Sequence, residues 1–276
     1  MIKERIMRLV LTLLFLLQAL PLSAEPIPFS PTAENEVPAA ILGKGGAPRG
    51  KPFKYYAANP NTVGYLAEPA GKGPHGAVIL IHEWNGLVDR VRQTADAFAA
   101  EGYVALAVDL YSGRTGSNPE ENMALVKETL ADQKEMIANL DAAAAYLKSR
   151  DDVIGKVAAI GWCFGGGVAL SFALGGENHE GTAIFYGSLL DDPEKMKHIH
   201  HEIYGTFAGN DHRITPDLVN KFVAALRKAG IKNDVHIYDD VNHGFWLYVD
   251  RDPDHNLGPA LDAWQRLKAY LKRTLQ

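Results

Sequence analysis

The stretch KVAAIGWCFGGGVALSFAL, residues 156–174, decides the fold of this chain. Lys156–Ile160 is a short apolar run typical of a buried strand, and Phe164–Leu174 has the pattern of a helix. Between them lies Gly161-Trp162-Cys163-Phe164-Gly165, which places a nucleophile between two glycines at a strand-to-helix turn. Such a turn holds its central residue in a strained conformation above the sheet, next to the amides of the helix N-terminus. The usual central residue is serine, and we predict that Cys163 takes its role as nucleophile.

Short apolar strands and helices alternate on both sides of this turn. The alternation predicts one α/β domain with a mostly parallel sheet that is covered by helices on both faces. Asn118-Pro119-Glu120-Glu121 predicts the start of a helical region that runs to about Lys148, with a break near Asp132. The other expected helices are residues 87–101, 164–174, 216–228 and 259–272. The expected strands are residues 53–57, 63–68, 77–81, 104–108, 156–160, 182–186, 203–208 and 235–238.

The first 24 residues have the pattern of a signal peptide. Lys3, Arg5 and Arg8 precede a short apolar run, and small residues end at Ala24, where we expect cleavage. An uncleaved anchor is the alternative, but the run is too short to span a bilayer comfortably. We therefore expect an exported protein of the bacterial periplasm. Residues 25–52 are rich in proline and glycine and predict an extended surface arm or disorder, and residues 53–276 form the α/β domain.

Composition limits the class of function. The chain has 276 residues, of which 47% are hydrophobic and 22% charged, and this balance excludes a disordered or a polytopic membrane protein. A net charge of −5 without a basic stripe makes nucleic acid an unsuitable partner. The single cysteine excludes an internal disulfide framework and a cysteine zinc cluster. A dinucleotide fingerprint would need glycine at position 163, so a Rossmann cofactor site is not expected.

A cysteine nucleophile needs a base, and the base needs a carboxylate that orients it. Asp211 follows the expected strand 203–208, and His243 follows the expected strand 235–238. Ligand sites in open α/β sheets gather at the carboxyl ends of the strands, so we expect both side chains near Cys163. Asp239 and Asp240 are second choices for the carboxylate, because they lie too close in sequence to His243 to come from a separate strand end.

No metal or cofactor site is expected. His82-Glu83 resembles the start of a zinc-protease helix, but Gly86 stands in place of the second histidine. His198, His200 and His201 form a cluster that precedes a strand, at the opposite end of the sheet from the expected site. We interpret this cluster as a solvated loop.

Several of these motifs together resemble the dienelactone hydrolases, over about residue 63 to the C-terminus. The resemblance implies an α/β-hydrolase fold and hydrolysis of an activated ester or lactone. The backbone amides of Phe164 and Trp84 would then form the oxyanion hole, and Glu83 would contact the resting thiol. The matching segments are Ile81-His82-Glu83-Trp84-Asn85-Gly86, Asp109-Leu110-Tyr111, Gly161-Trp162-Cys163-Phe164-Gly165-Gly166, Gly209-Asn210-Asp211 and Val241-Asn242-His243-Gly244-Phe245.

The family grips a substrate carboxylate with arginines, and this chain departs from that pattern. Arg114, with Tyr111, is the expected substrate-binding residue, although its segment carries one extra residue. Four positions after the histidine, where the second arginine would lie, stands Leu247. Neutral or singly anchored esters are therefore expected to do comparatively well, and the substrate preference is expected to differ from dienelactone.

The leading hypothesis is an exported hydrolase of small-molecule esters or lactones with a Cys163–His243–Asp211 triad, and we expect a monomer. A carboxylesterase or thioesterase of another substrate class is an alternative. A non-catalytic binding protein on a hydrolase scaffold is another, although all three triad positions are filled. A thiol-based sensor is disfavoured, because the chain has no second cysteine to resolve an oxidised thiol.

Overall fold

The computed structural model describes residues 30–276 and contains one eight-stranded sheet. The predicted signal peptide lies outside the described residues. The sheet order is β1-β2-β4-β3-β5-β6-β7-β8; the pairs β1–β2 and β2–β4 are antiparallel, and every pair from β4–β3 to β7–β8 is parallel. This confirms the expected α/β class. The strands are β1 (Lys51–Phe53), β2 (Gly64–Ala67), β3 (His75–Ile81), β4 (Val104–Ala107), β5 (Val153–Trp162), β6 (Gly181–Phe185), β7 (Ile203–Ala208) and β8 (Asn233–Tyr238).

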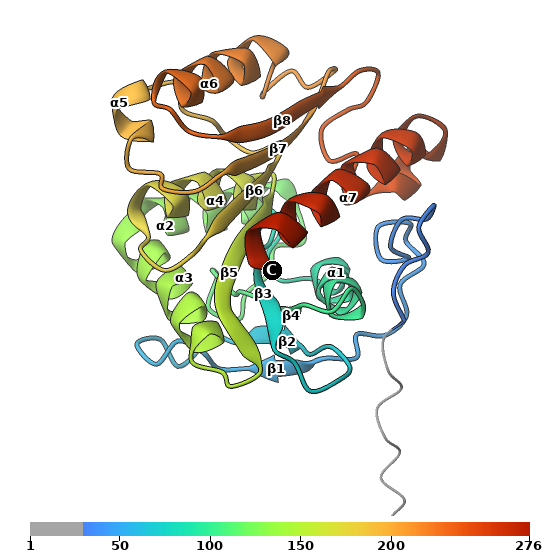
Figure 1. Ribbon diagram of the computed structural model, residues 1–276, viewed down its shortest axis with the longest axis vertical. Coiled ribbons are helices and arrows are strands. Elements are labelled where there is room, and N and C mark those ends of the chain that lie inside the picture. The colour runs from blue at the N-terminus through green and yellow to red at the C-terminus, as the bar shows by residue number, and fades with distance from the viewer. Residues whose placement is uncertain (1–29) are drawn as a thin grey trace, which may run out of the picture.

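Helices cover both faces of the sheet (Figure 1). One face carries α1 and α7, and the other carries α3, α4 and α6. The helices are α1 (Asp89–Ala100), α2 (Pro119–Ala131), α3 (Gln133–Lys148), α4 (Phe164–Gly175), α5 (Pro193–Met196), α6 (Pro216–Lys228) and α7 (Pro253–Leu275), with a 3₁₀ turn η1 (Val249–Arg251).

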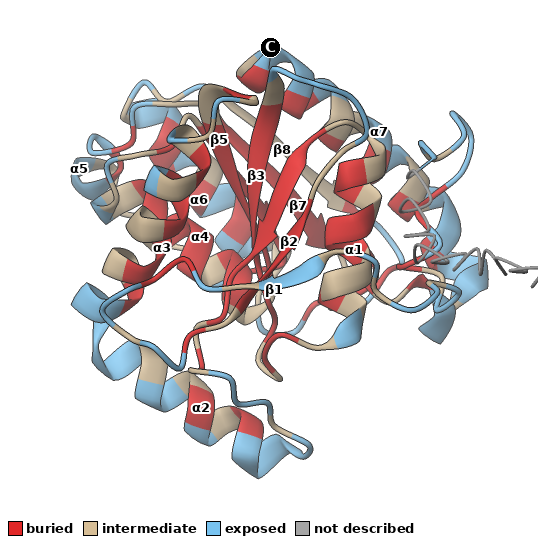
Figure 2. Ribbon diagram, turned by 90° about the horizontal axis from the view of Figure 1, so that it is seen from below, coloured by how far each residue is buried: buried red, intermediate tan, exposed pale blue. Residues whose placement is uncertain are grey.

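The central strands are buried on both sides, as their continuous apolar sequences require. In β5, Ala158, Ile160 and Trp162 face the α1–α7 core, whereas Val157 and Ala159 face the α3–α4 core. Figure 2 shows these strands as buried and β1 as exposed at the edge. The elbow that follows β5 is therefore held from both faces of the sheet.

The sequence predicted the helix break near Asp132 correctly and the start of the last helix incorrectly. The helical region after Asn118 breaks at Asp132, whose carboxylate accepts from the Glu135 amide at 3.0 Å and caps α3. The last helix begins at Pro253 and not at Pro259, which lies inside α7. Pro253 has the fixed φ that suits a first helical turn, and the buried Asn256 and Ala260 pack the extra turns onto the core.

The arm before the sheet differs from the expectation of a surface or disordered segment. Val37 and Ile41 are buried in the α1–α7 core, although the surrounding sequence is rich in proline and glycine. The Ile41 carbonyl accepts from the Val249 amide at 3.0 Å, and Arg90 Nη1 donates to the Ala40 carbonyl at 2.6 Å. Two apolar side chains are enough to fix the arm, but they form no periodic pattern that the sequence reveals.

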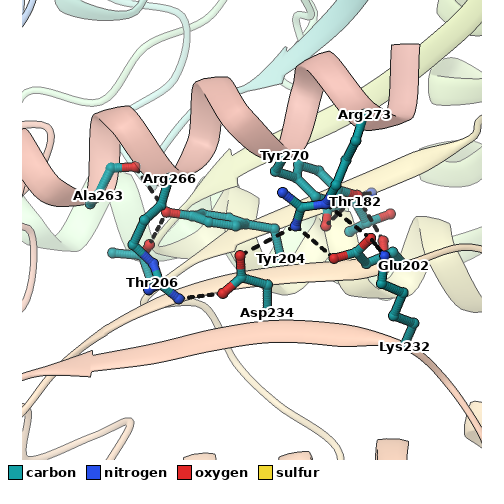
Figure 3. Close-up of polar contacts among 10 residues, drawn as sticks. All are labelled: Thr182, Glu202, Tyr204, Thr206, Lys232, Asp234, Ala263, Arg266, Tyr270 and Arg273. Atoms are coloured by element: carbon teal, nitrogen blue, oxygen red, sulfur yellow. Dashed lines mark hydrogen bonds and ion pairs between the residues drawn. The ribbon is translucent and has the colours of Figure 1, made fainter. Parts of the chain in front are cut away.

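Polar groups tie α7 to the strands beneath it (Figure 3). The Tyr270 hydroxyl donates to the Glu202 carbonyl at 2.7 Å and accepts from the Thr182 amide at 2.8 Å. Arg273 pairs with Glu202 at 2.6 Å and with Asp234 at 3.2 Å. No helix in the described part of the chain combines the length and apolar character needed to cross a membrane.

Candidate active site

Cys163 lies at the junction of β5 and α4 with φ 54° and ψ −114°. This conformation is sterically unfavourable for a side chain with a Cβ, and it turns the thiol out above the sheet. The neighbouring glycines make the turn possible. A Cβ on Gly165 would lie 2.2 Å from the Ile81 carbonyl oxygen, and one on Gly161 would lie 2.0 Å from the Gly165 carbonyl oxygen. The backbone at 161–165 is therefore the strained elbow that the sequence predicts.

Phe164 and Trp84, whose backbone amides are the predicted oxyanion hole, both line the same pocket as Cys163, and the role of these amides stays a prediction. The first turn of α4 packs against the end of β3, which leads directly into Trp84. His82 fixes that end, because its Nδ1 donates to the Glu83 carbonyl at 2.7 Å while its Nε2 accepts from the Leu110 amide at 3.2 Å. His82 is thus a buried structural residue.

His243 and Asp211 come together at the carboxyl ends of β8 and β7. His243 Nδ1 donates to Asp211 Oδ2 at 2.6 Å, and Asp211 Oδ1 accepts from the amides of Arg213 and Ile214 at 2.8 and 3.0 Å. Burial raises the pKa of Asp211, but these hydrogen bonds outweigh it and lower the pKa overall. The other two candidates for the carboxylate, Asp239 and Asp240, are exposed.

His243 also hydrogen-bonds Cys163, so the three side chains form one chain of contacts. Burial alone would lower the pKa of His243, but the hydrogen bonds to Asp211 and Cys163 raise it to about 10. An imidazole that is hydrogen-bonded to a carboxylate holds a proton more firmly than a free imidazole does. The arrangement therefore favours a base that can take the thiol proton.

Glu83 is buried next to this chain of contacts and hydrogen-bonds the Tyr248 hydroxyl. Burial raises the pKa of Glu83, against the hydrogen bond from Tyr248 and the attraction of His243, Arg251 and Arg90. The described partner of the carboxyl group is thus Tyr248, and the contact of Glu83 with the Cys163 thiol stays a prediction.

Aromatic rings support both halves of the site from below. Trp162, directly before Cys163, stacks on Trp246, which follows His243 by three residues, with 5.7 Å between centroids and 14° between planes. The Tyr186 ring lies 4.9 Å from the His243 ring, and its hydroxyl accepts from the Leu247 amide at 3.2 Å. These contacts fix the position of the histidine loop relative to the elbow.

Cys163 and His243 open into a pocket of about 600 Å³. Glu83, Trp84, Tyr186 and Tyr248 line it, together with two arginines, Arg213 and Arg251. The rest of the lining is mixed: six side chains are apolar, three are polar and two residues are glycine, namely Met123, Val126, Leu130, Phe164, Val168 and Ile214, then Asn85, Ser171 and Ser188, then Gly167 and Gly244. The sequence interpretation missed the two arginines and the two tyrosines. Tyr186 and Arg213 follow strand ends and could have been found from that position.

The two predicted substrate-binding residues are not among those that line this pocket, and their role stays a prediction. Arg114 forms a two-point ion pair with Glu128 at 3.0 and 2.5 Å and lines a separate, smaller pocket. The Tyr111 hydroxyl donates to the Trp84 carbonyl at 3.1 Å from a buried position. Leu247, which stands where the second arginine would lie, is buried. The cations that line the pocket are instead Arg213 and Arg251.

The histidine cluster lies at the opposite end of the sheet. His201 Nε2 shares the Thr182 hydroxyl with His179, whereas His198 and His200 are exposed. Within residues 30–276, no group of three or more His, Cys, Asp or Glu side chains is placed to hold a metal ion.

Comparison with known proteins gives a consistent result. The model of the dienelactone hydrolase family matches residues 62–275. Protein usf from Aquifex pyrophilus is 30% identical over 218 residues, covering 77% of this chain and 93% of that protein. A candidate carboxymethylenebutenolidase from Saccharolobus solfataricus is 29% identical over 247 residues, covering 76% and 93%.

Solved structures show the same fold. A dienelactone hydrolase-like promiscuous phosphotriesterase from metagenomic libraries superposes with a TM-score of 0.73 at 20% identity, covering 84% of this chain and all of that one. A candidate dienelactone hydrolase from Klebsiella pneumoniae gives a TM-score of 0.67 at 23% identity, covering 77% and 93%. These similarities establish the α/β-hydrolase fold.

Proposed function

Because the chain belongs to the dienelactone hydrolase family and is a hydrolase of that kind, we propose that it cleaves activated esters or lactones through a Cys163–His243–Asp211 triad and an acyl-enzyme intermediate. The observation that carries the proposal is the strained backbone of Cys163, with His243 in contact and Asp211 2.6 Å behind it. A resting structural cysteine needs neither the strain nor the histidine.

In the first half-reaction the Cys163 sulfur attacks the carbonyl carbon of the ester. The thiol proton passes to His243, and Asp211 keeps the imidazole in the tautomer that accepts it. The carbonyl oxygen becomes an oxyanion, which the Phe164 and Trp84 amides bind; one such donor is worth about 10²–10³ in rate. The carbon–oxygen bond then breaks, and the leaving oxygen takes its proton from His243.

The second half-reaction repeats these roles with water. His243 takes a proton from a water molecule, whose oxygen attacks the thioester carbon. Collapse of the second tetrahedral intermediate breaks the carbon–sulfur bond, and the proton returns to the sulfur. The product is a carboxylic acid. With a lactone, acid and hydroxyl remain in one molecule.

The proposed compartment is outside the cytoplasm, and the support for it is the leader pattern of residues 1–24. Expression of the full chain in a Gram-negative host, followed by fractionation and intact mass measurement, tests this. A periplasmic protein that starts at Glu25 is expected. A full-length protein in the cytosol contradicts it.

The triad is tested by trapping the acyl-enzyme. Rapid acid quench of the protein with a p-nitrophenyl ester should give a mass increase of one acyl group on Cys163, together with repeated turnover. Cys163→Ala should abolish both, and His243→Ala should lower turnover by several orders of magnitude while the protein stays folded. A binding protein gives no acyl adduct, and a thiol sensor gives an adduct without turnover; either result contradicts the proposal.

A further inference from the structure

Half of the six apolar side chains that line the active-site pocket come from α2, which stands apart from the rest of the fold. Figure 2 shows α2 at the margin of the molecule with much of its surface exposed. Met123, Val126 and Leu130 recur at spacings of three and four residues, which places them on one face of this helix. All three line the pocket.

A different face of α2 attaches the helix to the body of the protein. Leu125 is buried, and Thr129 Oγ1 donates to the Leu110 carbonyl at 3.3 Å. The ion pair of Glu128 with Arg114 adds an exposed link. The pocket-facing side chains are therefore not needed to anchor α2, and Leu130 remains 43% exposed. Three apolar side chains on one helix face that lines a pocket suit a ligand with an apolar part.

Other elements add both apolar and polar side chains to the lining, the polar ones including Ser171 of α4 and Ser188. Val168 and Phe164 from α4, with Ile214 from the loop after β7, line the cavity together with the α2 side chains. The volume of about 600 Å³ lies in the range of pockets that hold drug-sized ligands, and it far exceeds what a small lactone needs. The pocket therefore combines the reactive groups of Cys163 and His243 with six apolar side chains in one lining.

We propose that this apolar wall binds the larger, hydrophobic part of the substrate, so that the preferred substrates are esters with an aryl ring or an alkyl chain of about six carbons. This inference rests on the proposed function and specifies its substrate class. Each methylene that leaves water for such a wall raises kcat/KM by about fourfold, which corresponds to about 0.8 kcal/mol. Val126 and Leu130 are then specificity-determining residues.

The test compares p-nitrophenyl acetate, butyrate and hexanoate, and a parallel series of acetate esters with phenyl and alkyl alcohols. The first arm places the apolar group on the acyl side and the second on the alcohol side. In at least one arm, kcat/KM should rise by about fourfold per methylene. Val126→Trp, which fills the pocket, and Leu130→Gln should reduce the hexanoate-to-acetate ratio, or the matching alcohol ratio, by at least about tenfold.

Leu218→Gln is the matched control, because Leu218 is 40% exposed on α6 and does not line the pocket. It should leave both ratios unchanged. Ratios that do not respond to Val126→Trp and Leu130→Gln, or a wild-type preference for the smallest ester in both arms, overturn the inference.

A binding measurement separates this inference from the triad. Calorimetry of Cys163→Ala with two pairs of probes, hexanoate against acetate and hexanol against ethanol, should show at least about tenfold tighter binding of the longer probe in at least one pair, and Val126→Trp should remove the difference. Equal binding within both pairs overturns the apolar wall even if the triad turns over esters. Loss of the acyl adduct with the binding preference intact overturns the triad alone.

Discussion

Four ionisable side chains lie together in the candidate active site: Cys163, His243, Asp211 and Glu83. Two of them are carboxyl groups with opposite pKa directions. Hydrogen bonds lower the pKa of Asp211, whereas burial raises that of Glu83. The Asp211 carboxylate therefore stays charged behind the imidazole, whereas the Glu83 carboxylate is protonated more easily. Different environments thus give two similar side chains different roles.

Glu83 is expected to slow reactions of the resting thiol. Its negative charge near His243 and Cys163 opposes formation of a second negative charge on sulfur. Glu83→Gln should therefore react several-fold faster with iodoacetamide and lose activity faster in dilute peroxide than the wild type. Because burial raises the pKa of Glu83, the difference should grow as pH rises through that pKa and shrink below it.

Glu128→Gln serves as the control, since Glu128 is an exposed carboxylate on α2 paired with Arg114. Alkylation at the same rate in Glu83→Gln and the wild type, with the fold intact, shows that Glu83 does not guard the thiol.

The raised pKa of His243 also predicts how stability depends on pH. A histidine bound more tightly to its proton in the folded state stabilises the protein fully below its unfolded pKa of 6.5, and loses that contribution as pH rises through about 10. Relative to His243→Gln, the wild type should therefore lose free energy of unfolding between pH 6.5 and 10. The loss should be on the order of 2 kcal/mol, discounted for the third of the side chain that faces solvent. Parallel urea titrations of both proteins measure it, and equal pH dependence contradicts it.

Arg213 and Arg251 change the substrate preference that Leu247 predicts, which was for neutral or singly anchored esters. Two cations line the pocket from other positions, so a substrate carboxylate has partners there. Arg213→Ala and Arg251→Ala should each raise KM for an ester that carries a carboxylate by about tenfold, with a smaller change for its methyl ester. Steady-state kinetics on the matched pair decides, and Arg227→Ala, on the last turn of α6, is the control. Equal effects on both esters would show that the arginines do not bind the carboxylate.

At the scale of elements, strand ends were the most informative sequence signal. Cys163, Asp211 and His243 were each placed after a strand, and parallel strands bring such positions to one edge of the sheet. The boundary of α7 was misplaced because Pro259 has a strong local preference that tertiary packing overrides. Arg251 belongs to the short turn η1, and Tyr248 immediately precedes it; such a short turn leaves no periodic pattern in the sequence.

The attachment of α7 is a separate prediction at this scale. Tyr270→Phe removes the hydroxyl that joins the Glu202 carbonyl and the Thr182 amide, and leaves both groups without that partner. It should lower the free energy of unfolding by about 1–3 kcal/mol without changing kcat/KM. Chemical denaturation measures the loss. Tyr103→Phe is the matched control, because Tyr103 is also buried but, within residues 30–276, its hydroxyl does not bond a backbone group as the Tyr270 hydroxyl does. An equal loss of unfolding free energy in both variants contradicts the prediction.

At the scale of the whole molecule, the N-terminal arm is part of the core. The family match starts at residue 62, yet Val37 and Ile41 are buried against the segment that carries Val249. The arm therefore extends the α1–α7 core beyond the family domain. It also contacts the loop that presents His243 and Tyr248 to the pocket.

Ile41→Ala tests this contribution. Loss of a fully buried isoleucine should cost about 2–4 kcal/mol of unfolding free energy and speed hydrogen exchange at the Val249 amide. Glu36→Ala, an exposed change in the same arm, should do neither. Unchanged exchange at Val249 in Ile41→Ala would mean that the arm and the loop are not coupled.

The stacked pair of Trp162 and Trp246 has a spectroscopic consequence. The chain has four tryptophans, and these two, 5.7 Å apart, flank the nucleophile and the base in sequence. Indole rings at this separation interact as coupled chromophores. The near-ultraviolet circular dichroism and the quenching of their fluorescence therefore report whether the elbow and the histidine loop remain in register. The protein carries an intrinsic optical signal at the base of its active site, which requires no label and leaves the thiol unmodified.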